Sequence, residues 1–279
     1  MTAKDNKYYG FNPPGLIPEL FAPKIIGAEH HEHSVPTFSL DGTELYWSRQ
    51  YISDIERPQT IMMMKFVENK WSSPEIAPFS GEYHDGGPIF SFNEDLIYFY
   101  SMRPHLDRDV NYNNLWAISR SNSTWGVPYK LPFPINTEKF QVTPTISQDD
   151  TLYYTSYNEK ASRNMIFMFS KKKGNIWTKP QILSPNFNIR YQDWLPSIAP
   201  DNSFLIFSSL REPSEVFNLY LSKCKEDGTW GIPQCLSDQI NTAASERFPG
   251  LTRDGKFLFF IRESQIYWVS SDILKPYLD

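Results

Sequence analysis

Short apolar segments recur along the whole chain with a nearly constant period. Five prolines mark the period and follow one another after 52, 56, 52 and 53 residues: Pro36, Pro88, Pro144, Pro196 and Pro249. Each proline precedes an apolar residue with mostly small neighbours, which is what a strand with one buried face requires. A turn residue stands five positions after each proline: Asp41, Asn93, Asp149, Asp201 and Asp254. Each proline therefore marks a predicted first strand, and each turn residue marks the turn that ends it.

Three further segments complete each repeat. An aromatic-rich run follows each turn, as in residues 45–47 and 258–260, and such a run is typical of a buried strand. A third apolar run comes next, as in residues 61–63. A Trp-x-x-Pro motif then leads into a short segment where proline suits an edge strand: Trp71/Pro74, Trp125/Pro128, Trp177/Pro180 and Trp230/Pro233. Four strands per unit, without helical periodicity, predict the blades of a β-propeller.

The fifth repeat has only three strands, and the N-terminus is predicted to supply the fourth. Residues 23–26 match residues 180–183 of the third repeat, with Leu20 in the tryptophan's place. Such pairing would remove an open sheet edge and close the ring. The sequence thus predicts one all-β domain over residues 1–279. Its expected fold is a five-bladed β-propeller of four-stranded antiparallel blades, with the last blade closed by the N-terminal strand.

Composition and charge exclude several classes of protein. Hydrophobic residues make up 40% of the chain and charged residues 21%, so a large core is expected. The net charge is −5 and the basic residues are scattered, which argues against a nucleic-acid surface. No apolar run is long enough to span a membrane, and no phosphate-cradling glycine loop predicts a nucleotide cofactor. Because no signal sequence is visible, a cytoplasmic location is expected, or a periplasmic or secreted one if a leader has been removed.

The repeat resembles a known family. The unit Pro-x-x-Ser-x-Asp-Gly, followed by an aromatic strand and serine in residues 36–48, is similar to the TolB-like (WD40-like) propeller repeat. The resemblance covers nearly the whole chain and implies the propeller fold. The family includes interaction modules and enzymes such as oligogalacturonate lyase, so the resemblance implies no single activity. That lyase has a larger ring, and its ligand positions are not carried over.

One column of polar residues leads into the first strands. Three positions before the repeat prolines stand His33, Asp85, Gln141, Asp193 and Glu246. If these segments are extended, the column points toward the ring axis. His33, Asp85, Asp193 and Glu246 are therefore candidate catalytic residues. Gln141 and the neighbouring Trp194 are candidate substrate-binding residues.

Arginines recur near the same predicted face, at the end of the second strand. They occupy four of the five repeats: Arg49, Arg103, Arg211 and Arg262. Guanidinium groups around a polar mouth would suit a small polar or anionic ligand. The structural alternative is that these arginines brace neighbouring blades through carboxylates of the loops.

Histidines are concentrated just before the first repeat. His31 and His33 point the same way in an extended segment, and His84 stands at the equivalent place of the next repeat. Three such imidazoles with nearby carboxylates would hold a divalent ion such as Zn, Mn, Ni or Ca. A solvated polar run is the alternative.

Two classes of function are consistent with these patterns. The first is a metal-dependent lyase or hydrolase that acts on a polar or anionic, carbohydrate-like substrate at the ring axis. A metal-free variant would use Asp85, Asp193 and Glu246 as glycosidase carboxylates, with Trp194 as a sugar platform. The second class is a propeller that binds a ligand or a protein partner without catalysis.

Overall fold

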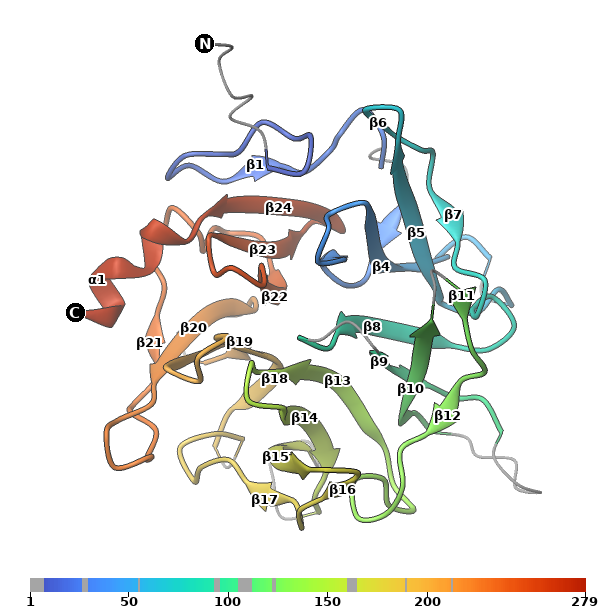
Figure 1. The fold of residues 1–279 in the computed structure, drawn as a ribbon. Helices are drawn as coiled ribbons and strands as arrows, with labels where there is room; N and C mark the ends of the chain where they lie inside the picture. Colours follow the sequence, from blue (N-terminus) through green and yellow to red (C-terminus); the bar gives the residue numbers. More distant parts are fainter. Residues whose placement is uncertain are drawn as a thin grey trace.

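The strands form a ring of five sheets around a central axis in the computed structural model (Figure 1). The structure describes residues 8–26, 30–54, 56–92, 96–104, 112–121, 124–159, 165–188, 190–211 and 213–279. The predicted all-β five-bladed propeller is confirmed. Within the described residues no helix is long and apolar enough to cross a membrane.

Each blade is an antiparallel sheet whose strands follow the chain order outward. Blade 1 contains β3 (Thr37–Phe38), β4 (Glu44–Gln50), β5 (Thr60–Val67) and β7 (Glu75–Ile76), with the added short strands β2 (His31–Glu32) and β6 (Lys70–Trp71). Blade 2 contains β8 (Asp85–Phe90), β9 (Leu96–Ser101), β10 (Asn114–Ser121) and β12 (Tyr129–Lys130), with β11 (Thr124–Trp125) added. Blade 3 contains β13 (Gln141–Ile146), β14 (Thr151–Tyr157), β15 (Met165–Lys173) and β17 (Gln181–Ile182), with β16 (Ile176–Trp177) added.

The last two blades follow the same plan. Blade 4 contains β18 (Gln192–Ile198), β19 (Phe204–Leu210), β20 (Asn218–Lys223) and β21 (Gln234–Cys235). Blade 5 contains β22 (Glu246–Leu251), β23 (Phe257–Arg262), β24 (Gln265–Ser270) and β1 (Glu19–Leu20). The chain ends in a 3-10 turn, η2 (Ser271–Leu274), and a short helix, α1 (Lys275–Leu278), on the outside of the ring (Figure 1).

The core lies in the seams between neighbouring blades. At one seam Phe38 and Trp47 of blade 1 belong to the same buried cluster as Phe259 and Trp268 of blade 5. The other clusters join neighbouring blades in the same way. Because every middle strand is covered on both faces, its residues are apolar or aromatic almost without alternation, as the sequence pattern indicated.

The N-terminal strand closes the ring, but it is not the predicted segment. Glu19 and Leu20 of β1 pair with Trp268 and Tyr267 of β24, whereas residues 23–26 form a turn. The correct match for the outer-strand prolines is Pro18, five residues before Pro23. Phe21 then takes the buried position held by Leu183 in blade 3, and its N–H donates to the carbonyl of Ile266 at 2.8 Å.

The first strands bend just before the repeat proline. In four blades the preceding residue has a positive φ: Gly87, Thr143, Leu195 and Phe248, at 57°, 53°, 58° and 53°. The pairing register shifts at the same place in each of these blades. A positive φ is uncommon for residues other than glycine, and such strain tends to mark functional places. Asn93, the predicted turn residue of blade 2, lies outside the described residues.

Candidate functional site

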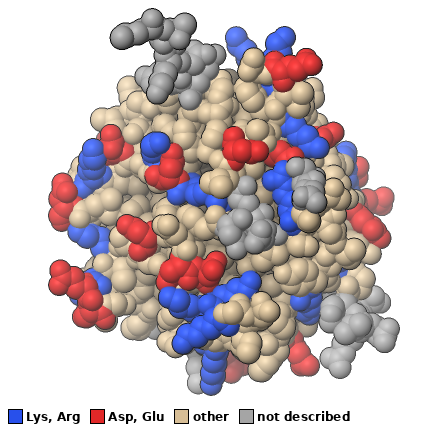
Figure 2. All heavy atoms as spheres, viewed as in Figure 1, with Lys and Arg blue, Asp and Glu red and all other residues tan. Residues whose placement is uncertain are grey.

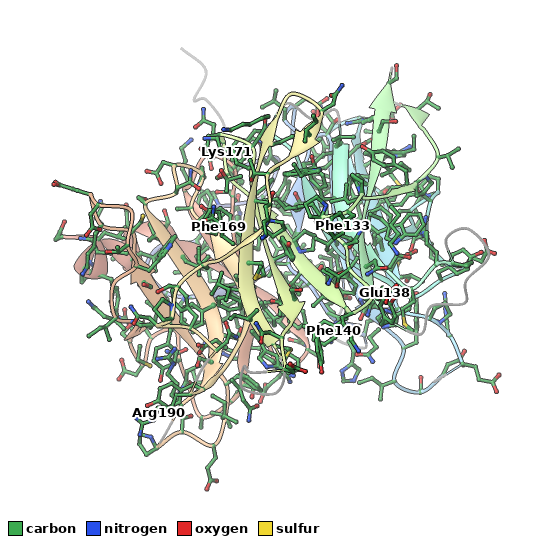
Figure 3. The ribbon with its side chains drawn as sticks, turned by 90° about the horizontal axis from the view of Figure 1, so that it is seen from below. Phe133, Glu138, Phe140, Phe169, Lys171 and Arg190 are labelled. Carbon is green, nitrogen blue, oxygen red and sulfur yellow. The ribbon has the colours of Figure 1, made fainter. Side chains whose placement is uncertain are left out.

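The ring has two different faces. One carries the segments leading into the first strands, with His33 and His84, and is called the histidine face below. The other carries the turns after the first strands, with Asp41, and is called the turn face. In the edge-on view of Figure 3, Phe140 and Arg190 lie at one face and Lys171 lies at the other. Acidic and basic side chains are intermixed over the turn face, apart from a basic group at its lower edge, over β15 and β16 (Figure 2).

Buried carboxylates and arginines form ion pairs under the histidine face. A carboxylate at the start of the blade meets an arginine near the end of the second strand in four blades: Glu32–Arg49 at 2.6 Å, Asp85–Arg103 at 2.9 Å, Asp193–Arg211 at 2.9 Å and Glu246–Arg262 at 2.8 Å. Asp85, Asp193 and Glu246 have no exposed surface. Charge-assisted hydrogen bonds satisfy both partners of each pair.

The arginines also join consecutive parts of the ring. Arg103 donates to the carbonyl of Phe79 at 3.0 Å, and Arg262 donates to the carbonyl of Ile240 at 2.7 Å. Both carbonyls belong to the segment that arrives from the outer strand of the preceding blade. Each guanidinium also lies over aromatic rings of its own blade, with Arg103 5.1 Å from the centroid of Phe99.

These contacts change the interpretation of eight predicted site residues. Asp85, Asp193 and Glu246 are buried in pairs with Arg103, Arg211 and Arg262, so this geometry offers none of them as an open catalytic group. Arg49 is likewise held, by Glu32. We call the buried residue at this position of each blade its anchor. In blade 3 the anchor is Gln141, which is neutral. It has no exposed surface and hydrogen-bonds to Asn114, Thr137 and Ser156. The sequence-based column thus marks the supports of the ring.

His33 does not belong to that column. Blade 1 has one more residue than the other blades between the carboxylate and the repeat proline, so Glu32 occupies the anchor position. His33 is the residue after the anchor, and its counterparts in blades 4 and 5 are Trp194 and Arg247. Glu32 and Arg247 were missed by the sequence analysis because it counted positions backward from the proline.

His33, His84 and Arg247 gather near the axis from blades 1, 2 and 5. The ring of His33 lies 4.5 Å from that of Phe248. Burial lowers the pKa of His33 to about 4, and the nearby His84, Arg247 and His31 lower it further in the same direction. Burial also lowers the pKa of His84, although Asp85 opposes the shift. Both imidazoles are therefore neutral at neutral pH.

Polar groups at this place are left without partners. Within the described part of the chain, Nδ1 of His33 and Nε1 of Trp194 are buried and accept or donate no hydrogen bond. Arg247 is exposed and makes no ion pair with any described residue. Its guanidinium lies 5.9 Å from the ring of Phe217, which is 6.0 Å from the ring of Trp194. We call His33, His84, Trp194 and Arg247 the axial mouth.

The axial mouth does not form the predicted metal site. No three His, Cys, Asp or Glu side chains among the described residues are arranged to hold a metal ion. His31, His33 and His84 are therefore not assembled as a ligand set. His31 is exposed and its Nδ1 lies 2.6 Å from the hydroxyl of Ser264.

Comparisons with known proteins identify the fold. No family model and no curated protein matches the chain. A thermostable family-43 glycoside hydrolase is similar over 90% of this chain and 91% of its own, with a TM-score of 0.58 and 10% identity. An α-L-arabinofuranosidase from Lactobacillus brevis is similar over 87% and 86%, with a TM-score of 0.53 and 15% identity. A nidogen/laminin complex is similar over 82% and 74%, with a TM-score of 0.53 and 10% identity.

These similarities show a propeller fold that a family-43 glycoside hydrolase, an α-L-arabinofuranosidase and a chain of the nidogen/laminin complex also have. At such low identity they carry no information on the activity of this chain. Membership of the TolB-like family is not shown, because no family model matches.

Proposed function

We propose that the axial mouth binds a carboxylate-bearing, carbohydrate-like substrate and that the protein is a lyase- or hydrolase-type enzyme. The observation that carries the proposal is the contrast between Arg247 and the four paired arginines. Arg49, Arg103, Arg211 and Arg262 are committed to buried carboxylates, whereas Arg247 is exposed and has no acidic partner among the described residues. An exposed guanidinium is a suitable receptor for a carboxylate.

The neutral imidazoles supply the chemistry. A neutral imidazole has a free ring nitrogen that can accept a proton. His84 is the better acceptor of the two, because Asp85 opposes the effect of burial on its pKa, whereas the pKa of His33 is lowered to about 4. With the carboxylate on Arg247, one imidazole is placed to take a proton from the substrate. In a lyase the proton leaves the carbon next to the carboxylate, its electron pair forms a double bond, and the leaving group departs with the electrons of its own bond. In a hydrolase the proton comes from the attacking water.

A propeller that only binds a ligand or a protein partner remains the second candidate. The nidogen/laminin complex has a similar ring and is a protein complex. The two candidates differ in the role of the histidines, because a binding protein needs no proton acceptor.

The test uses paired acidic and neutral sugars. We expect calorimetry to detect binding of uronic acids and their short oligomers but weak binding of the neutral sugars. Arg247→Ala should lower the affinity for the acids by about 10- to 100-fold, which is the usual effect of losing a charge-assisted hydrogen bond. Lys172→Ala removes the same charge from the turn face and is the matched control. Equal affinity for acids and neutral sugars, or an Arg247→Ala variant that binds normally, would contradict the proposal.

Turnover separates the enzyme from the binding protein. Release of reducing ends or of an unsaturated product should stop in His33→Gln or His84→Gln while binding to Arg247 persists. Binding without product formation in the unaltered protein would instead favour the second candidate.

A further inference from the structure

A cavity of about 110 Å³ lies on the axis of the ring. The first strands of all five blades line it, with Val35, Ile89 and Leu195 among the apolar side chains that face it. The five repeat prolines belong to the same wall. Val35 and Ile89 are only partly buried, although they lie inside the ring. Both residues line the cavity.

Three hydroxyl groups of the wall make hydrogen bonds within the ring. The hydroxyl of Thr37 accepts the N–H of Phe90 at 3.2 Å, and that of Thr145 accepts the N–H of Ile198 at 3.4 Å. Thr143 donates to the hydroxyl of Thr155 at 3.0 Å. These bonds join one blade to the next or one strand to its neighbour. With these hydroxyl groups engaged and apolar residues such as Val35, Ile89 and Leu195 in the lining, the cavity suits carbon better than sugar hydroxyls.

The cavity begins one residue below the axial mouth. Along three first strands a mouth residue is followed directly by a wall residue: His33 by Ser34, Trp194 by Leu195 and Arg247 by Phe248. The rings of His33 and Phe248 are in contact across blades 1 and 5. The apolar cavity is therefore lined by residues that directly follow three residues of the polar mouth.

The wall at the turn face is held by cross-ring contacts. Arg253 of blade 5 donates to the carbonyls of Ser91 and Phe92 in blade 2, and its guanidinium lies 5.1 Å from the ring of Phe92. Tyr8 and Tyr9 from the N-terminus also contribute to this end. The ligand is therefore expected to arrive from the histidine face.

We propose that the ligand of the axial mouth carries a compact apolar group of up to about six carbon atoms, which occupies the axial cavity. This inference rests on the proposed function, because it takes the anionic group to lie on Arg247. The size follows from a comparison: an apolar protein cavity of roughly 150 Å³ binds benzene. The substrate class is thus a sugar acid that carries a small acyl, branched-alkyl or aryl substituent, which adds affinity to that of the unsubstituted acid.

The experiment measures affinity against the size of the apolar group. Carboxylates from acetate through butanoate and 3-methylbutanoate to benzoate and octanoate are titrated by calorimetry, beside the alcohols of the same carbon skeletons. Affinity should rise about fourfold for each added carbon, as expected for a buried methylene, and should fall again at octanoate. The alcohols should show the same increments at lower affinity.

Two substitutions locate the effect in the cavity. Ile89→Trp fills the cavity and should abolish the increments, whereas Ile89→Ala enlarges it and should move the best ligand to a larger size. The two variants are expected to change the ligand preference in opposite ways. If one of them does not fold, the affinities of the other still test the proposal. Val127→Trp adds the same bulk at a residue that is 83% exposed on the outer edge of blade 2, and is the control.

The outcomes distinguish this inference from the proposed function. If Arg247→Ala weakens all acids but affinity does not depend on carbon number, the cavity proposal is wrong and the anion site stands. If the increments depend on Ile89 while acids and alcohols bind equally, the cavity proposal holds and the proposed function fails. Increments that persist unchanged in Ile89→Trp would also overturn the cavity proposal.

Discussion

At the scale of single residues, the decisive feature is where each charge finds its partner. Asp85 accepts hydrogen bonds from Arg103 and from Ser80, and no part of it reaches solvent. A buried ion pair adds little net stability compared with an apolar pair, because both charges lose their hydration. Removal of one partner is costly, because the other charge stays buried alone.

The Asp85 pair provides a stability prediction. Asp85→Ala should lower the free energy of unfolding by about 3–5 kcal/mol, since Arg103 would keep its charge in a buried place. Urea denaturation measures the change. Lys171→Ala is the control, because the Lys171–Asp149 pair is exposed and its loss should cost less than about 1 kcal/mol. A similar small effect for both variants would show that Asp85 is not a structural support.

His33 provides a prediction of pH dependence. Its pKa falls from 6.5 to about 4 on folding, so the unfolded chain takes up a proton that the folded protein refuses. This histidine should therefore lower stability progressively as the pH falls from about 6.5 to about 4, by at most about 3 kcal/mol. Denaturation at several pH values should show a smaller loss in His33→Gln than in the unaltered protein, and His31→Gln serves as the control. A difference between the unaltered protein and His33→Gln that is independent of pH would contradict the burial argument.

At the scale of elements, the period of the prolines was enough to locate every blade. The repeat predicts the blades because each strand of a blade is buried to a different extent, and burial determines which residues occur there. The middle strands are rich in aromatic residues, and proline and tryptophan occur at the outer edge. Trp125 shows the packing behind the motif. It lies against Tyr46 and Phe90 of the adjoining seam and donates to the hydroxyl of Tyr46 at 3.1 Å.

Single-residue offsets were not readable from the same pattern. Pro18 and Pro23 both precede short apolar segments, and the choice between them depends on Phe21 entering the seam among Phe38, Phe259 and Trp268. Phe259 and Trp268 lie near the other end of the chain, so the local sequence around Phe21 does not reveal this contact.

The site failed to be predicted for a related reason. The direction of a side chain before the repeat proline depends on a bend that uses positive φ at Thr143, Leu195 and Phe248. None of these three residues is a glycine, and only Gly87 of blade 2 marked the bend in the sequence. The alternation of side chains expected for an extended strand therefore placed the buried anchors at the axis, and Arg247 was overlooked.

A recurring asparagine was a signal that sequence reasoning could have used. Asn136, Asn188 and Asn241 stand five residues before the anchors of blades 3, 4 and 5. Each accepts a backbone N–H at the start of a third strand, at 2.8, 3.1 and 2.7 Å. In these three blades the asparagine is therefore a second marker of the anchor, beside the repeat proline that follows it.

At the scale of the whole molecule, stability depends on one seam where the two ends of the chain meet. Blade 5 lacks its outer strand without β1, and the N-terminal residues 8–11 add a second layer to this seam. Tyr8 packs edge-on to Phe257 at 4.6 Å, and Phe11 stacks on Trp71 at 5.4 Å. The amino-terminal segment thus covers both the edge of β24 and the apolar surface beside it.

Deletion of residues 1–21 is expected to open the ring. It exposes the edge of β24 together with Trp268 and Phe259, and an unpaired apolar edge favours association between chains. Size-exclusion chromatography should show oligomers or aggregates, and the thermal midpoint should fall. Phe21→Ala should reproduce part of the loss, about 3–5 kcal/mol, while Leu20→Ala, at a residue that is 38% exposed, should cost far less. A monomeric truncated protein with an unchanged midpoint would mean that the other four seams hold the ring closed by themselves.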